Sequence, residues 1–205
     1  VAFDDYYNGH VKTRKLVLTI YESDEASAKA LKANEIDING IVPIPAIKAD
    51  LEAADFEGVD YDSPGTFGLY INTIREDTIL ANKEVRKAIS QAMDRKTLID
   101  EAGNNNQPVT QVIPKSLPGH DDSITFPAFD LTAAKATLAA AGYKNEQIEF
   151  VYVKELQVDA PIILAQLKAL GLNIKEISFS ADEVDKAVEL AQAGDYDLFT
   201  AGFTS

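Results

Sequence analysis

Side chains that could support acid–base, nucleophilic or metal chemistry are few in this sequence, and they are scattered. Its two histidines, His10 and His120, are far apart, and neither has the HxxxH or HxxE spacing that places two metal ligands on one helical face. There is no cysteine, which excludes disulfides, thiolate metal sites and cysteine nucleophiles. The run Gly119-His120-Asp121-Asp122 could bind a cation, but two aspartates in a polar loop are more typical of turns. The sequence therefore predicts no metal and no cofactor.

Motifs of common enzyme classes are absent as well. The sequence has no GxSxG, GxxxxGK[ST] or GxGxxG pattern, so nothing indicates acyl transfer on a hydrolase fold or nucleotide binding. Adjacent carboxylates such as Asp4-Asp5 and Asp121-Asp122 lie in predicted loops, whereas acid–base catalysis needs two groups in opposed environments. We predict that the chain is not an enzyme, with a carboxylate-dependent hydrolase as the alternative from another class.

Two arginines and some aromatic residues are weaker candidates for ligand contacts. Arg86 and Arg95 flank the apolar face of a predicted helix and could meet an anionic ligand, although pairing with nearby acids such as Glu84 or Asp94 is more usual. Alternation along strands favours core packing for at least half of the aromatic candidates. These are Tyr61, Phe67 and Tyr70.

Composition narrows the class of partner. The 205 residues include 19 Lys and Arg against 33 Asp and Glu, and the net charge of −14 would repel nucleic acid and anionic lipid headgroups. No window approaches the roughly 18 consecutive apolar residues of a membrane helix, and Val1–Asp5 lacks the features of a signal peptide. If the protein is exported, we expect its targeting segment to have been removed.

The first part of the chain gives short, mixed signals. The triplet Ser63-Pro64-Gly65 is the strongest break, and we place a lobe boundary there. Before it, β-branched residues, caps and prolines predict a strand at Lys15–Tyr21, a helix from Ser23 or Asp24 to about Ala33, a β-like Ile36–Ile38, a helix starting near Pro43 or Pro45, and a strand at Val59–Asp62. After it, Phe67–Ile71 is predicted to be a strand.

The second part is more regular. From Asn82, apolar residues at Val85, Ala88, Ile89, Ala92 and Met93 have the spacing of an amphipathic helix. Residues 103–129 hold four prolines and predict a long irregular connection. The elements that follow are predicted as a helix at Ala133–Ala141, a strand at Ile148–Val153, a helix from Pro161 to Gly171, a strand at Asn173–Phe179, a helix between the capping box Ser180–Glu183 and Gly194, and a strand at Tyr196–Thr200.

This order of elements places a candidate site at the end of the chain. Strand, helix, strand, helix, strand over 148–201 is two successive βαβ units, which predicts an α/β fold with parallel neighbouring strands. Ligands of open α/β sheets bind beyond the carboxyl ends of the strands. Residues Thr200 to Thr204 end the last strand, so we expect them at the ligand-binding edge, with core packing as the alternative for the Phe203 ring.

Several segments together resemble one family over nearly the whole chain. Asn82–Arg95 is similar to the family's "n.kVRqAis.AidR" helix, and Gly194–Leu198 is similar to its "gdyDl" motif. Further matches are the aromatic-Gly opening Tyr6–Gly9, the strand Leu16–Tyr21, the segment Ala30–Ile38 in which Asn34 replaces a glycine, the strand Gly65–Asn72, and the Asp130 to Tyr143 region. The chain resembles the family 5 extracellular solute-binding proteins, the oligopeptide-, dipeptide- and nickel-binding components of ABC transporters.

The resemblance implies a fold and a division into lobes. The fold would be the α/β, periplasmic-binding-protein-like type (type II, cluster C-like), with a mixed sheet and flanking helices. Residues 1–64 would be part of a first lobe leading to the hinge, and residues 65–205 part of the second, ligand-binding lobe. Members of the family are considerably longer, so the chain would be a fragment. Closure about the hinge would trap the ligand between the lobes.

The resemblance also implies a site and a role. Thr200, Gly202, Phe203 and Thr204 would line the ligand cleft, with Gly202-Phe203 in the place of the family's Gly-Trp pair, and their backbone groups would extend the hydrogen-bond ladder of a bound peptide. The role would be that of an extracytoplasmic receptor for oligopeptides, in the periplasm or at the cell surface, either free or lipid-anchored through a segment outside this chain. It would deliver its ligand to a membrane permease.

Other readings stay open from the sequence. Within the family, the ligand could be a peptide pheromone, a nickel chelate or another non-peptide solute. Outside it, the hydrolase named above and a structural or signalling module remain. We also expect that exposed apolar faces of an incomplete first lobe could drive self-association.

Overall fold

The computed structural model describes residues 7, 9, 12–40, 45–59, 65–75, 77–102, 106–154 and 156–203, apart from the side chains of Pro45 and Phe203. The chain divides into two compact units, Val1–Gly58 and Val59–Ser205. The lobe boundary predicted after residue 64 stays a prediction, because residues 60–64 lie outside the described part of the chain.

The first unit contains two short helices, α1 (Asp24–Lys32) and α2 (Pro45–Glu52). Ser23 caps α1 as predicted, since its hydroxyl oxygen accepts a hydrogen bond from the Ala26 N–H at 3.1 Å. The two helices are held together by a small apolar cluster, with Ala28 and Leu31 from α1 and Leu51 from α2. So small a core stabilises little by itself.

Two strands predicted in the first unit are wrong. Neither residues 15–21 nor residues 36–38 form a strand, and Leu18 and Ile20 are 84% and 97% exposed. A strand is stable only when a neighbouring strand pairs with it, and the described remainder of this unit forms helices and turns. Of the strand predicted at Val59–Asp62, residues 60–62 lie outside the described residues, and Val59 is not in a strand.

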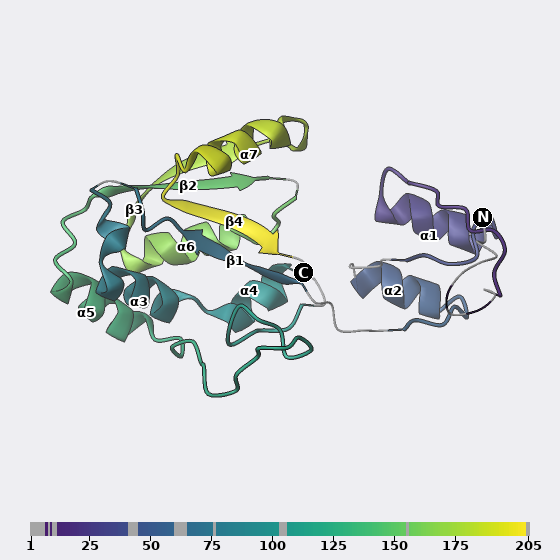
Figure 1. Ribbon diagram of the computed structural model, residues 1–205, viewed down its shortest axis with the longest axis horizontal. Coiled ribbons are helices and arrows are strands. Elements are labelled where there is room, and N and C mark those ends of the chain that lie inside the picture. The colour runs from purple at the N-terminus through teal and green to yellow at the C-terminus, as the bar shows by residue number, and fades with distance from the viewer. Residues whose placement is uncertain are drawn as a thin grey trace. The chain divides into compact units, whose positions relative to one another are not determined.

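The second unit is built on a four-stranded mixed sheet (Figure 1). Its strands are β1 (Thr66–Ile71), β2 (Gln147–Val153), β3 (Asn173–Phe179) and β4 (Leu198–Phe203), in the order β1-β4-β2-β3. β2 is parallel to both of its neighbours, as the two predicted βαβ units require, and β1 is antiparallel to β4. The predicted α/β class and mixed sheet are confirmed.

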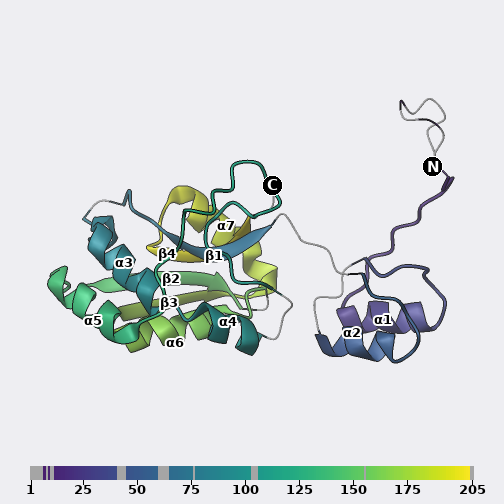
Figure 2. The ribbon, with the colours of Figure 1, turned by 90° about the horizontal axis from the view of Figure 1, so that it is seen from below.

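Helices cover both faces of this sheet (Figure 2). On one face lie α3 (Lys83–Ala92), α4 (Arg95–Ala102), α5 (Leu131–Ala140) and α6 (Ala160–Leu170). On the other face α7 (Val184–Ala193) packs on β2 and β3. Two 3-10 turns, Ile79–Ala81 and Ala181–Glu183, precede α3 and α7.

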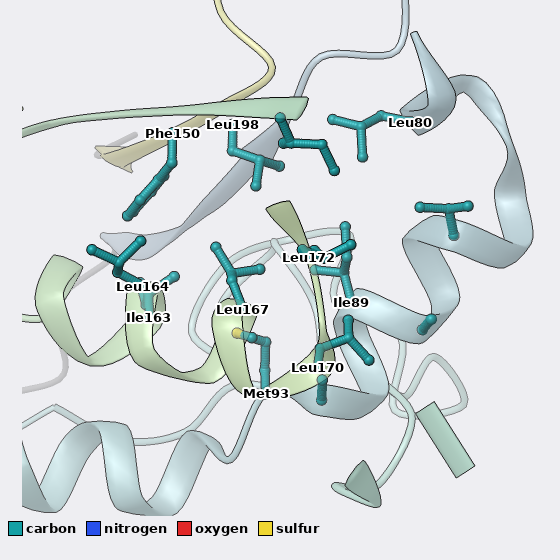
Figure 3. Packing of buried hydrophobic residues seen from close by; sticks show 14 of the residues in the cluster. Leu80, Ile89, Met93, Phe150, Ile163, Leu164, Leu167, Leu170, Leu172 and Leu198 are labelled. Carbon is teal, nitrogen blue, oxygen red and sulfur yellow. The ribbon is translucent and has the colours of Figure 1, made fainter. Parts of the chain in front are cut away.

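The main core lies between the sheet and the α3, α5 and α6 layer (Figure 3). Phe150 and Leu198 from the sheet and Leu167 from α6 are fully buried. Burial of side chains of this size contributes roughly 1.5–3 kcal/mol each. Alternation along β2 sends Val151 and Val153 to the opposite face, where α7 lies.

The predicted helix ends are confirmed where local capping chemistry defines them. At the start of α3, the side chain of Asn82 accepts a hydrogen bond from the Glu84 N–H at 2.9 Å. At the start of α5, the side chain of Asp130 accepts one from the Ala133 N–H at 2.9 Å. Gly171 and Gly194, at φ of 104° and 70°, end α6 and α7 in the left-handed region that glycine adopts without strain. The predicted irregular connection is present over 106–129.

Candidate functional site

The carboxyl edge of the sheet brings together three parts of the chain that are distant in sequence. β2 ends there at Val153, β4 ends at Phe203, and the antiparallel β1 starts there, because Thr66 is paired with Phe203. The loop from β2 to α6 crosses the same edge. This is the edge where the βαβ topology predicts a ligand.

Gln157 joins the loop to both strands. Its side-chain oxygen accepts hydrogen bonds from the Val153 N–H and the Thr200 hydroxyl, each at 2.7 Å, and its side-chain nitrogen donates to the Thr200 carbonyl. Gln157 is 8% exposed and Thr200 is fully buried. The predicted site residue Thr200 is thus buried at this edge, and its hydroxyl donates a hydrogen bond to Gln157.

Gly202 is the predicted site residue that is exposed at this edge. It is paired with Phe67 of β1, and a Cβ added at Gly202 would lie 3.2 Å from Cδ2 of the Phe67 ring. The ring of Phe67 is itself partly exposed. Glycine at position 202 therefore lets the Phe67 ring lie close to the β4 backbone. The Phe203 backbone ends β4, while its side chain and Thr204 lie outside the described residues.

The loop before α6 alternates between exposed apolar and buried polar residues. Leu156 and Val158 are 60% and 57% exposed, whereas Gln157 and Asp159 are buried. Asp159 precedes α6, but its side chain makes no capping hydrogen bond. Burial raises the pKa of its carboxyl group above the usual aspartate value. The candidate site is therefore a polar floor with apolar side chains beside it.

The sequence reasoning missed the loop residues of this site. Phe67 was a candidate, but Leu156, Gln157, Val158 and Asp159 were not. The available signal was topological, because the loop after the first strand of a βαβ unit must cross the carboxyl edge. Their composition carried no recognisable motif.

The opposite, amino edge carries a dense charge network. Arg75 lies 3.0 Å from Glu149, 3.1 Å from Asp195 and 3.4 Å from Asp197. Hydrogen bonds from Lys175 and then Arg75 lower the pKa of Glu149. Asp197 also accepts the Glu149 N–H at 2.8 Å.

Asn72 also lies at this edge and holds neighbouring backbone segments together. Its side chain donates to the carbonyls of Gly194 and Tyr196, at 2.9 and 3.0 Å, and accepts the Ile74 N–H. A hollow of about 260 Å³ lies among Arg75, Glu149, Asp197 and their neighbours. Because Arg75 is paired with both Glu149 and Asp197 at this hollow, we interpret the amino edge as a structural clamp on β1, β2 and β4.

The remaining sequence candidates lie elsewhere and have structural contacts. His120 bonds within its own loop, to the Ile113 carbonyl at 2.8 Å and the Asp122 carboxylate at 3.2 Å. Arg86 donates to the carbonyls of Leu80 and Ala81. No group of three or more histidines and acids that could hold a metal occurs among the described residues.

Arg95, the first residue of α4, contacts the end of α3 and the long loop. It donates to the Ser90 carbonyl and hydroxyl, and its guanidinium lies 4.7 Å from the centre of the Phe126 ring. Burial lowers the pKa of this guanidinium. Neither Arg86 nor Arg95 forms an ion pair with Glu84 or Asp94, the acids that the sequence suggested.

Comparison with known proteins identifies the class to which this fold and edge belong. The profile of "Bacterial extracellular solute-binding proteins, family 5 Middle" matches residues 1–205. The chain belongs to this family, as the sequence resemblance predicted. The family consists of extracellular and periplasmic solute-binding proteins. In the described part of the chain, no helix has the length and apolar character needed to cross a membrane.

Solved structures share the fold. HbpA2 from Haemophilus parasuis is 24% identical, with a TM-score of 0.77, over 99% of this chain and 41% of that one. A dipeptide-binding protein from Pseudoalteromonas sp. SM9913 was solved in complex with Met-Leu. It is 18% identical, with a TM-score of 0.72, over 99% of this chain and 41% of that one. AgaA from A. tumefaciens R10, in complex with agropinic acid, is 28% identical with a TM-score of 0.67, over 90% and 38%. The chain thus spans about two fifths of these proteins.

Proposed function

We propose that this chain is part of the receptor of an ABC importer and that it binds small peptides at the carboxyl edge of its sheet. The observation that carries the proposal is the open end of β4. Among the described residues, β2 pairs with β4 only at Leu198 and Phe199, whereas β1 pairs with β4 as far as Phe203. One side of the last residues of β4 therefore faces no paired strand.

Strand geometry indicates which backbone groups lie on that side. Successive residues of a strand direct their N–H and C=O groups alternately to its two sides. The Thr200 carbonyl points to the side away from β1, because it accepts the Gln157 amide there. Gly202, two residues later, directs its N–H and C=O to the same side. We propose that these groups pair with the backbone of a bound peptide, as in β-strand addition.

The predicted site residues then have different roles. Gly202 would allow a ligand to approach the backbone, and Phe203 and Thr204 would be further ligand contacts. Thr200 would act indirectly, because its buried hydroxyl fixes Gln157 at the base of the site. Residues 1–64 would belong to the first lobe and 65–205 to the second, with a hinge crossing near Gly65.

The related structures support a solute receptor rather than an enzyme. The dipeptide-binding protein was solved with Met-Leu, which favours a peptide ligand. The protein would act outside the cytoplasm, free or lipid-anchored, and would deliver its ligand to a membrane permease. Nothing in the comparisons supports the self-association that the sequence suggested.

A non-peptide solute is the second candidate, and one observation favours it. AgaA has the highest identity of the three structures described above, and it was solved with agropinic acid. The same open edge could take such a solute through Gly202 and the loop before α6. The family membership stays the same in both cases.

The test is calorimetry and thermal shift on the complete receptor with mixed di- to hexapeptides. A peptide that binds should raise the unfolding temperature, since it binds the folded state alone. No response to any peptide, together with binding of a non-peptide solute, would select the second candidate. Hydrolysis of the peptides would contradict the receptor function.

A further inference from the structure

Asn39 is followed by a glycine in a segment without regular structure. Among the asparagines in the described part of the chain, it is the one whose next residue is glycine. Neither Asn39 nor Gly40 lies in a helix or a strand, and Gly40 is exposed. The side-chain amide of an asparagine can react with the backbone nitrogen of the residue that follows it. Glycine obstructs that nitrogen least, because it has no Cβ.

The reaction is a deamidation through a cyclic imide. The Gly40 nitrogen loses its proton and forms a bond to Cγ of Asn39, the Cγ–Nδ2 bond breaks, and Nδ2 leaves as ammonia. Water then opens the ring. Cleavage of the bond from the Gly40 nitrogen to Cγ gives aspartate, and cleavage of its bond to the main-chain carbonyl carbon gives isoaspartate. Water is the co-reactant, so the conversion needs neither an enzyme nor a cofactor.

The surroundings of Gly40 allow this reaction. A Cβ added at Gly40 would meet no atom within 4 Å, so the backbone has room to rotate. The Gly40 N–H donates to no other described residue, so no bond within that part of the chain holds its nitrogen in place. Asn34 is a matched contrast, because the next residue, Glu35, has a Cβ and donates its N–H to the Ala30 carbonyl at 2.9 Å.

The Asn39 side chain holds this segment against α1. Its Nδ2 donates to the Ser27 hydroxyl oxygen at 3.0 Å, and that hydroxyl donates to the Asp24 carbonyl at 2.9 Å. A carboxylate at position 39 has no N–H to donate, so Ser27 would keep at most one of these two hydrogen bonds. Deamidation therefore weakens the link between this segment and the start of α1.

We propose that Asn39 is a site of spontaneous deamidation and that its conversion loosens residues 36–40 from α1. Both products carry a carboxylate that is ionised at neutral pH, and isoaspartate also lengthens the main chain. The inference is independent of the proposed function, because neither the reaction nor its structural effect involves the ligand.

Peptide mapping of the complete receptor tests the reaction. The protein is incubated in mildly alkaline buffer, which favours loss of the Gly40 proton, and the peptide that contains both Asn34 and Asn39 is sequenced by mass spectrometry. We expect Asn39 to be converted to aspartate and isoaspartate while Asn34 stays intact. G40A should slow the conversion by about tenfold or more, because a Cβ shields the nitrogen and restricts rotation. No conversion at Asn39, or an equal rate in G40A, would overturn the proposal.

Hydrogen exchange on the complete receptor tests the structural effect. N39D reproduces the aspartate product, and S27A removes the oxygen that accepts the Asn39 amide. Each variant should speed exchange at residues 36–40 by about threefold or more, the effect of one hydrogen bond. The double variant should exceed neither, because both changes remove the same contact.

The matched control for charge is N34D. It adds the same negative charge in the same unit, and we expect it to leave exchange at residues 36–40 unchanged. If N39D exchanges no faster than N34D, the proposed loosening from α1 is wrong.

Discussion

The two edges of the sheet differ in how their polar groups are satisfied. At the amino edge, Arg75 is paired with three carboxylates, and Asn72 holds the backbone around Gly194 and Tyr196. At the carboxyl edge, Gly202 is exposed and Asp159 has no partner in another residue. Both edges are polar, so polarity alone does not mark a site. Polar groups without a partner in another residue, beside exposed apolar side chains, indicate a ligand site better than polarity does.

The largest effect is expected at the amino edge, from D197A. Asp197 is buried and bonds to the Glu149 N–H, so its loss leaves that N–H and part of Arg75 without a partner. We expect a loss of about 2–3 kcal/mol in the free energy of unfolding, measured by urea denaturation. Ligand affinity should stay near that of wild type.

D195A is the matched control at the same edge. Asp195 also pairs with Arg75, but its side chain is 70% exposed, and an exposed ion pair contributes at most about 1 kcal/mol. Equal losses for D197A and D195A would contradict the interpretation that buried pairing makes this edge a structural clamp.

At the carboxyl edge, Q157L should affect both stability and binding. Leucine has a similar size but leaves the Val153 N–H and both Thr200 groups without their partner. We expect a loss of about 2 kcal/mol in stability and a weaker affinity for the ligand, since the loop before α6 is no longer fixed to β4. Urea denaturation and calorimetry measure the two effects.

T200V separates these contributions. It removes the hydroxyl that donates a hydrogen bond to the Gln157 oxygen, and it keeps the bond from the Gln157 nitrogen to the Thr200 carbonyl. We therefore expect the free energy of unfolding to fall by about 1 kcal/mol. If Q157L lowered stability and left ligand affinity unchanged, Gln157 would stabilise the fold without supporting the ligand site.

A pair of strand glycines sharpens the comparison further. A Cβ at Gly202 would lie 3.2 Å from the Phe67 ring, at the proposed site, whereas a Cβ at Gly68 meets no atom within 4 Å. G202A should weaken ligand binding by about tenfold with a change in stability below about 1 kcal/mol, because the added methyl group would displace the Phe67 ring beside the backbone that the ligand approaches. G68A should leave affinity unchanged. Calorimetry with both variants decides this.

The smallest effect is expected from D159N on the receptor without ligand. Burial raises the pKa of the Asp159 carboxyl group in the folded state, so its ionised form opposes folding. The penalty is absent below the unfolded value of 3.8 and grows as pH rises through the folded pKa. D159N should therefore be slightly more stable than wild type at about pH 7, with little difference at about pH 3. Urea denaturation at both pH values would show a destabilised D159N if the carboxylate served the fold.

Features fixed by neighbouring residues could be predicted from the sequence. The Asn82 cap, the apolar spacing of α3 and the capping box before α7 depend on residues a few positions apart. The strand predicted at Lys15–Tyr21 was wrong because β-branched composition does not supply a pairing partner. Local patterns define helices better than strands for this physical reason.

The candidate site could be located from the sequence but not described in detail. The βαβ order placed the end of β4 at the ligand edge, and the exposed Gly202 is consistent with that. The burial of Thr200 and its bond to Gln157 join residues 43 positions apart. Contacts of this kind depend on how α6 packs on the sheet, which no local pattern encodes.

Hydrogen exchange of the complete receptor, with and without a bound peptide, compares the two edges most directly. We predict that the ligand slows exchange at residues 156–159 and 200–203 and leaves residues 72–75 and 194–197 unchanged. Protection at the amino edge, with none at the carboxyl edge, would contradict the assignment of the ligand site and move it to the hollow around Arg75.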